Sequence, residues 1–247
     1  DANISVSGQI SLTQRAGAEL TDLRGEAGGR VMWLTLNEGA GATHFEDTTL
    51  EGNHGACIAP HCPDSDVAGY FGKGAQFDGV DDYIAIPRSI ADDFTISFWF
   101  KSDQVDGGSG QWWEGMGLVD GEVVGGSDDF GVSLGAGHVL FGVGGPDTTV
   151  QSGFVADGEW HHVAAARDKE RGSLRLYVDG DLVDETSGAS TASLTSPPEL
   201  RIGSIQTDRR FFEGVIDDVQ ITPLTLSADE VMELYNQPVF RLSMNDL

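Results

Sequence analysis

The sequence predicts an all-β protein, an antiparallel β-sandwich (jelly roll) with one short helix towards the C-terminal end. Apolar residues alternate with polar or small ones in residues 94–103, 130–144, 159–168 and 174–185, which is the period of strands with one buried face. Turn signals separate these strands at intervals of about ten residues, as in sandwiches and jelly rolls. A length of 247 residues suits one large β-domain.

Two of the turns are hairpin tips. Asp179-Gly180 joins "LRLYV" to "DLVDE", and both residues tolerate the positive φ that tight hairpin turns require. Residues 169–172, "KERG", close the preceding hairpin in the same way. Consecutive hairpins predict neighbouring antiparallel strands.

Residues 227–236 have helical periodicity instead. Ser227 and Glu230 have the spacing of a capping box, and apolar residues follow at helical spacing as far as Tyr235. Pro238 lies just beyond, where a helix has ended. We therefore expect a single short helix here.

The domain boundaries follow from these patterns. Residues 30–237 form the predicted sandwich, and residues 1–29, rich in Gly, Thr and acid, are interpreted as a linker or N-terminal extension. The end of the chain, residues 238–247, contains "VFRLSMND", which matches "VMWLTLNE" near the first strand. It is either a strand that completes the sandwich or the start of a following repeat, and the shared Asn-acid pair favours the repeat.

The charge restricts the partners. The chain carries 40 acidic against 14 basic side chains, a net charge of −26. Such a surface repels nucleic acid and anionic headgroups, so we expect no nucleic-acid partner. No apolar run approaches the roughly 20 residues of a bilayer crossing, so no membrane insertion is expected.

The two cysteines are close in sequence, in "CIAPHC". In an acidic chain with three lysines, Cys57 and Cys62 are read as a disulfide of an oxidising, extracellular or cell-surface compartment. The alternative is zinc held by His54, Cys57, His61 and Cys62, although this spacing is unusual for zinc.

Adjacent His161 and His162 lie in the predicted strand 159–168. Neighbouring residues of a strand point to opposite faces, so these histidines cannot share one metal ion. We interpret both as structural.

Five segments together resemble a known family. They are "GAQFDGVDDYIAIP", "FTISFWFKSD", "DGEWHHVAAARD", "LRLYVDGDLV" and "FEGVIDDVQI" with the following "LSADEVMELYN". In this order they resemble the laminin G-like jelly roll of the concanavalin A-like lectin/glucanase superfamily, which is related to pentraxins. The resemblance implies two packed antiparallel sheets and a lectin-like function, and it implies that the acidic group Asp78, Asp81 and Asp82 is a hairpin turn.

The resemblance also implies a structural calcium ion between the loop after the first strand and the last strand. That loop offers Asp47 and Asn53. On the last strand, Asp217 alternates with apolar residues and is expected to point inward, where a buried carboxylate must be paired, protonated or metal-bound. Asp218 is expected to be solvated. The alternative for Asp217 is that it accepts hydrogen bonds from backbone amides.

A second calcium position corresponds to the ligand-binding calcium of pentraxin-like relatives. Asp128 and Asp129 precede one strand, and Gln206 and Asp208 precede the last one. The sequence lacks the Glu-Gln-Asp run of pentraxins at this place, and plain turn aspartates are the alternative.

Residues 106–122, "DGGSGQWWEGMGLVDGE", are the strongest candidate for ligand binding. Trp112 and Trp113 lie among glycines, in no pattern that buries both. Exposed indoles stack on sugar rings, and flanking groups such as Glu114 bind hydroxyls; Gln206, Asp208 and Arg209 are expected to contribute from the neighbouring loop. The alternative is a tryptophan loop folded against the end of the sandwich.

These observations lead to one principal hypothesis. The chain is expected to be a calcium-stabilised carbohydrate-binding (lectin-like) module of an extracellular bacterial protein, such as an adhesin, with Ca²⁺ as its ion. Neutral or fucosylated glycans are favoured because the net charge repels anions. No Glu-x-Asp-x-x-Glu run of the glucanase relatives occurs, so no enzyme activity is expected. The alternative is a structural spacer or protein-interaction module in a tandem-repeat surface protein.

Overall fold

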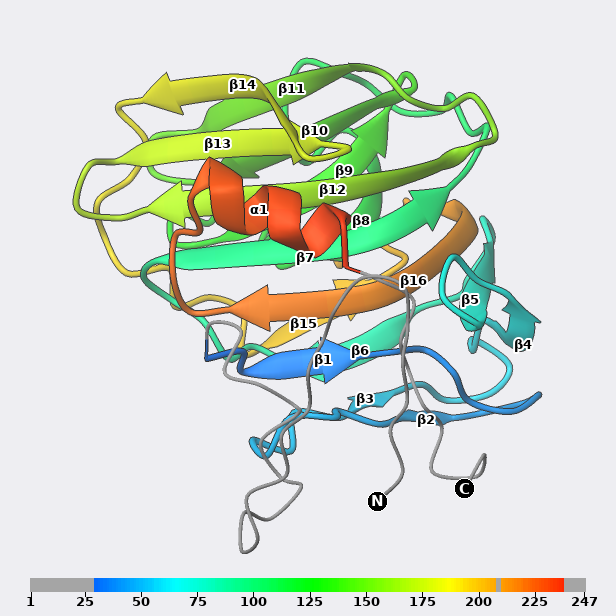
Figure 1. Cartoon of the computed structure of the whole chain (residues 1–247). Coiled ribbons are helices and arrows are strands. Elements are labelled where there is room, and N and C mark those ends of the chain that lie inside the picture. The colour runs from blue at the N-terminus through cyan, green and yellow to red at the C-terminus, as the bar shows by residue number, and fades with distance from the viewer. Residues whose placement is uncertain (1–28, 208–209, 238–247) are drawn as a thin grey trace, which may run out of the picture.

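The computed structural model describes residues 29–207 and 210–237 and confirms the predicted β-sandwich (Figure 1). Three parts of the sequence lie outside the described residues: residues 1–28 of the predicted extension (1–29), the predicted terminal segment (238–247), and the pair Asp208 and Arg209. The described strands form two sheets, and all their pairings are antiparallel. No helix within the described ranges is long and apolar enough to span a bilayer.

Sheet A has the order β14-β13-β12-β7-β16-β5-β4, and β1 pairs with the second half of β16. Its strands are β1 (Met32–Leu34), β4 (Asp64–Ala68), β5 (Lys73–Asp78), β7 (Phe94–Lys101), β12 (Trp160–Asp168), β13 (Ser173–Val178), β14 (Asp181–Ser187) and β16 (Glu213–Thr222).

Sheet B has the order β11-β10-β9-β8-β15-β6-β3-β2. Its strands are β2 (His44–Phe45), β3 (Gly55–Ala56), β6 (Ile84–Pro87), β8 (Met116–Asp120), β9 (Phe130–Gly135), β10 (His138–Val143), β11 (Thr148–Phe154) and β15 (Glu199–Ile202).

The core lies between the two sheets. Phe94, Phe98 and Phe100 alternate along β7 and are fully buried. From sheet B, Phe130 and Phe141 meet them, with ring centroids 4.8 and 6.1 Å from that of Phe94. Burying a phenylalanine side chain contributes about 1.5–3 kcal/mol, so this aromatic layer holds the sandwich together.

The predicted turns are present. Asp179 and Gly180 have φ values of 53° and 86° and join β13 to β14, while the 169–172 turn joins β12 to β13. The alternating segment 130–144 forms two strands, because Ala136 and Gly137, with φ values of 50° and 81°, turn the chain between β9 and β10.

The predicted helix is α1 (Ala228–Tyr235), which lies across the outer side of sheet A (Figure 1). Its capping box is formed, with Ser227 accepting from the Glu230 amide and Glu230 accepting from the Ser227 amide. Val231 and Leu234 pack on small residues of β12, so the helix covers an apolar strip of this face.

A β-bulge in β16 overturns one prediction. Asp217 pairs with Trp99 and Gln220 with Ser97, so three steps along β16 match two along β7. Asp218, with a φ of 56°, is the extra residue, and it reverses the side-chain alternation beyond it. Asp217 therefore lies on the outer face of sheet A beside Trp99, and the expectation that it points into the sandwich is wrong.

Candidate functional site

The loop between β7 and β8 folds over the outer face of sheet B. Gly131 of β9 pairs with Gly142 of β10 on the face opposite the core phenylalanines, and the indole of Trp112 lies on both. A Cβ at Gly142 would come within 2.2 Å of Trp112 Cδ1, and one at Gly131 within 2.9 Å of Cζ3. Because neither glycine has a side chain, the two strands leave a flat surface on which the indole can pack.

This packing corrects the sequence prediction for Trp112. Its side chain is 1% exposed, so it is not an exposed stacking platform. The neighbouring Trp113 is half-buried, and the two rings meet edge to face at 5.4 Å. Of the two indoles, Trp113 is therefore the more accessible to a ligand.

Hydrogen bonds fix the loop in this place. Glu114 Oε2 accepts from the amides of Gly110 and Gln111, at 2.9 and 3.2 Å. Ser133 donates its hydroxyl to the Trp112 carbonyl at 2.5 Å, and Arg210 donates to the carbonyl of Trp113. Glu114, predicted to bind ligand, is placed where it shapes the loop.

A pocket of about 340 Å³ opens beside the two indoles. It combines aromatic rings with three carboxylates and a backbone loop, and we call it the tryptophan pocket. Its lining residues are Trp112, Trp113, Glu122, Val123, Val124, Gly125, Gly126, Asp129, Asp147 and Thr207.

Two buried carboxyl groups, Asp129 and Asp120, belong to this region. Asp129 lines it and is 3% exposed; its Oδ2 accepts the Val123 amide at 2.8 Å, whereas its Oδ1 has no hydrogen-bond partner. Burial raises the pKa of Asp129 because the charged form loses its hydration. Burial, with a smaller contribution from the nearby Asp129 charge, raises the pKa of the fully buried Asp120 well above its ordinary value.

The two loops predicted to form the second calcium position, before β9 and before β16, both reach this pocket. The Gln206 amide donates to Asp120 Oδ2 at 3.3 Å, and the following residue, Thr207, lines the pocket together with Asp129. The Gln206 side chain instead donates to the Glu199 carbonyl at 2.6 Å, and Asp128 accepts from the Thr195 hydroxyl at 2.6 Å.

Sequence reasoning missed three acidic groups of this site: Asp120, Glu122 and Asp147. The first two end the "WWEGMGLVDGE" stretch, and Asp147 lies in the β10–β11 turn. The acidic residues after the tryptophans were a usable signal for the first two. Asp147 approaches only through the pairing of β10 with β9, so no local signal marks it.

The structure does not assemble the predicted calcium set of Asp47, Asn53 and Asp217. Asp47 Oδ1 accepts the amides of Trp33 and Thr49, and its Oδ2 accepts from the Thr49 hydroxyl and the Asn53 amide. The Asn53 side chain donates to the Val31 carbonyl at 2.6 Å. These donors close the loop, as a cation would.

The last strand uses its two aspartates in the same manner. Asp217 Oδ2 accepts the Phe71 amide at 2.7 Å, which is the alternative considered for this residue. Asp218 is 3% exposed and accepts from Trp33 Nε1 and Gln220 Nε2, both at 2.7 Å. The expectation that Asp218 is solvated is wrong, because the bulge directs it beneath the β1 segment.

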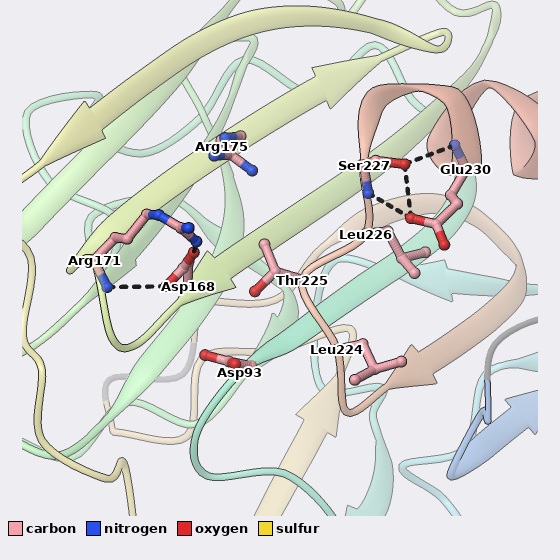
Figure 2. A pocket seen from close by; sticks show the side chains of 9 residues that line it. All are labelled: Asp93, Asp168, Arg171, Arg175, Leu224, Thr225, Leu226, Ser227 and Glu230. Carbon is pink, nitrogen blue, oxygen red and sulfur yellow. Dashed lines mark hydrogen bonds and ion pairs between the residues drawn. The ribbon is translucent and has the colours of Figure 1, made fainter.

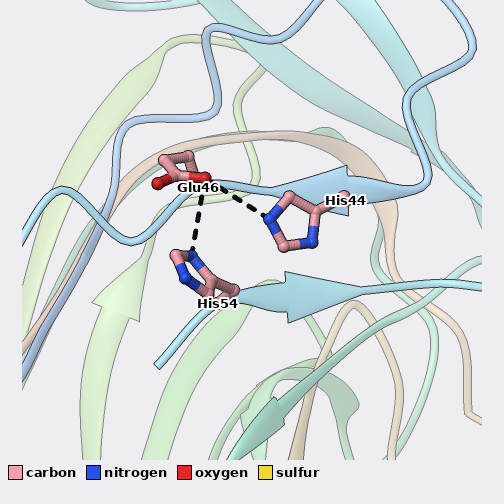
Figure 3. Close-up of side chains that lie close together, drawn as sticks. All are labelled: His44, Glu46 and His54. Atoms are coloured by element: carbon pink, nitrogen blue, oxygen red, sulfur yellow. Dashed lines mark ion pairs between the residues drawn. The ribbon is translucent and has the colours of Figure 1, made fainter. Parts of the chain in front are cut away.

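Within the described residues, three ligand atoms of acidic, histidine or cysteine side chains come within 4.8 Å of one another in two places. One is His44, Glu46 and His54, drawn in Figure 3, and the other is Asp78, Asp81 and Asp82. Neither contains a residue of the predicted calcium sets. Cys57 and Cys62 form the predicted disulfide, which leaves no thiolate for the zinc alternative.

The adjacent histidines lie on opposite faces, as predicted. His161 contacts the carboxylates of Asp179 and Asp157, at 2.8 and 3.2 Å. His162 is 2% exposed on the other face, with its ring near Trp99. The contacts of both side chains are with other side chains of the protein.

A second hollow, of about 380 Å³, lies beside the start of α1 (Figure 2). Arg171 pairs there with Asp168 at 2.5 Å, and Ser227 and Glu230 hold each other in the helix cap. The Arg171–Asp168 pair stabilises the turn after β12, and the Ser227–Glu230 pair stabilises the N-terminal cap of α1.

Comparison with known proteins places the fold. A family model described as the concanavalin A-like lectin/glucanases superfamily matches residues 78–232, which confirms the resemblance seen in the sequence. No curated protein matches the sequence significantly.

Solved structures include three instructive matches. The binding domain of Paraclostridial Mosquitocidal Protein 1 is 16% identical, with a TM-score of 0.65, over 84% of this chain and 52% of that one. Domain 4 of AbnA, an extracellular arabinanase from Geobacillus stearothermophilus, in complex with arabinotriose, is 18% identical with a TM-score of 0.62, over 85% and 99%. The ligand-binding domain of botulinum neurotoxin serotype D, in complex with N-acetylneuraminic acid, is 12% identical with a TM-score of 0.63, over 86% and 52%.

At these identities the likeness shows the fold alone. This chain spans about half the length of the mosquitocidal-protein and neurotoxin domains, 52% in each case, and nearly all of the arabinanase domain.

Proposed function

Because the chain belongs to the concanavalin A-like lectin/glucanases superfamily, we propose that it is a carbohydrate-binding module whose ligand occupies the tryptophan pocket. Two structures of the same fold are complexes with sugars, arabinotriose in one and N-acetylneuraminic acid in the other. They support the ligand class for this chain.

The observation that carries the proposal is the composition of the pocket. Trp113 is half-buried there, and an indole face packs on the apolar C–H surface of a sugar ring. Glu122, Asp129 and the exposed Asp147 supply carboxylate oxygens that accept hydrogen bonds from hydroxyls. The volume of about 340 Å³ is at the small end of ligand pockets, so it suits one or two sugar rings.

The charge narrows the ligand class. Three carboxylates line the pocket in a chain of net charge −26. A sialylated or sulfated glycan would meet like charges here, which costs binding free energy. Neutral or fucosylated glycans are the ligands we propose.

Of the two predicted calcium positions, only the one at Asp128 and Asp129 is retained in the proposal. Asp47 already accepts four hydrogen bonds from protein groups, which fills the lone-pair positions of its carboxylate, so it does not fit a calcium ion. Asp129 fits better, because it is buried and its Oδ1 has no hydrogen-bond partner. We propose Asp128 and Asp129 as the residues that would hold Ca²⁺, an ion that prefers carboxylate oxygens.

We also propose an extracellular bacterial origin, with the chain as a module of an adhesin. The Cys57–Cys62 disulfide supports an oxidising compartment, since cytosolic thiols are kept reduced.

The test is a glycan array probed with wild type, Trp113→Ala and Trp160→Ala. Trp160 is a matched control, because it is also half-buried but lies on sheet A. The proposal predicts neutral-glycan binding that Trp113→Ala abolishes and Trp160→Ala retains. Equal binding by all three proteins would contradict the assigned site.

The second candidate is a spacer or protein-interaction module. The edge strand β14 favours it, because Leu182 and Val183 are 46% and 41% exposed there, as a surface for a neighbouring module would be. A folded wild-type chain that binds no glycan on any array would favour this second function over carbohydrate binding.

A further inference from the structure

Three side chains gather on one face of the β2–β3 hairpin. His44 pairs with Ala56 and Phe45 with Gly55, so the next step along the same register sets Glu46 opposite His54. His44 and Glu46 are two residues apart and therefore share a face of the strand. Figure 3 shows the two imidazoles next to each other, both facing the Glu46 carboxylate.

The separations between these groups match the edges of a metal polyhedron. Glu46 Oε2 lies 3.4 Å from His44 Nε2 and 3.6 Å from His54 Nδ1, and one ligand atom of each residue lies within 4.8 Å of the other two. Zinc binds nitrogen and oxygen at about 2.0–2.2 Å in a tetrahedron, which sets its ligands about 3.4 Å apart. Two edges are therefore nearly in place, and the third requires a small approach of the two rings.

One hydrogen bond of the hairpin fixes the tautomer of His54. The Asp47 amide donates to His54 Nδ1 at 3.0 Å, so in the neutral ring Nδ1 carries the lone pair and Nε2 the proton. This same Nδ1 faces Glu46. A metal ion takes the place of the amide donor there, at the cost of one ordinary hydrogen bond.

The scaffold around the three residues is braced. The neighbouring Asp47 carboxylate closes the loop between β2 and β3, and the disulfide of Cys57 follows β3. Bracing of this kind reduces the ordering needed when an ion binds.

We propose that His44, Glu46 and His54 form a zinc-binding site. Two imidazoles and one carboxylate suit a borderline transition-metal ion, whereas calcium would require more oxygen ligands. The side chains are 57%, 64% and 37% exposed, so the fourth zinc position faces solvent and accepts water or a group from another molecule. The site is independent of the tryptophan pocket.

The test is calorimetric titration of the chelator-treated 247-residue chain with zinc chloride. The wild type should bind zinc, and His44→Gln and Glu46→Gln should each weaken that binding by at least about tenfold, since even the loss of an outer partner of a metal ligand costs about that much. His44 is exposed and supports no backbone group, so its replacement should leave the melting temperature in chelator unchanged.

The matched control is His61→Gln. His61 is 44% exposed and pairs with Asp81 at 2.9 Å, so it is another exposed imidazole beside a carboxylate. Its replacement should leave zinc affinity unchanged, and millimolar calcium should not compete. The proposal is overturned if wild type binds no zinc, if His44→Gln binds it as tightly as wild type does, or if His61→Gln abolishes binding.

Discussion

Replacing His162 by phenylalanine should make the fold markedly more resistant to acid. The imidazole is 2% exposed and lies near the rings of Trp99 and Tyr235, at centroid distances of 5.2 and 6.1 Å. Burial lowers the pKa of His162 from 6.5 to about 4, against the smaller opposing effect of the Asp218 and Asp179 charges.

The sign and size follow from proton binding. The folded pKa lies below the unfolded one, so His162 contributes stability that is complete above pH 6.5 and is lost as the pH falls towards 4. A shift of about 2.5 pKa units corresponds to about 3 kcal/mol. Phenylalanine has no proton to bind, so this loss disappears in the variant, whatever constant packing cost the substitution adds.

The assay is urea unfolding of each protein at pH values near neutrality and near 4.5. Between these two pH values, the free energy of unfolding of wild type should fall by about 2–3 kcal/mol more than that of His162→Phe. His161→Gln is the control of opposite sign: burial acts to lower the pKa of His161, but Asp179 and Asp157 together raise it, so its contribution is present at acid pH and is lost as the pH rises. Equal losses of unfolding free energy in wild type and His162→Phe would show that burial of the His162 imidazole does not set the acid sensitivity of the fold.

Three further changes test other parts of the fold. Burial, with the charge of Asp78 nearby, raises the pKa of Asp82 from 3.8 to about 6, so the stability that its protonated form contributes is lost as the pH rises through 6. In urea unfolding, Asp82→Asn should be about 3 kcal/mol more stable than wild type near pH 7 and equally stable below pH 3.8. Replacing Cys57 and Cys62 by serine should cost about 2 kcal/mol, measured in the same way, because a small loop is no longer closed. Arg167→Met should cost about 3 kcal/mol in thermal unfolding, because four carbonyls lose a fully buried guanidinium; an unchanged melting temperature would contradict this role.

Local features of the fold could be predicted from the sequence. The capping box at Ser227, the turn at Asp179 and the Cys57–Cys62 bridge each depend on residues a few positions apart. Their chemistry is complete within the segment, and the surrounding sheets only have to tolerate it.

The candidate site could be predicted only in part. Trp112 is buried because Gly131 and Gly142 become neighbours across two strands, a pairing that no local pattern contains. Asp217 changed face because one extra residue, Asp218, enters β16 as a bulge. Both outcomes depend on register, and a single step of register moves a side chain to the other face of the sheet.

The most direct test of the proposed function is a crystal structure of the chain with a neutral oligosaccharide selected on the array. We expect a sugar ring against the indole of Trp113, with hydroxyls donating to Glu122, Asp129 or Asp147. A sugar bound instead on sheet A, for example at the stacked rings of Tyr70 and Trp99, would contradict it.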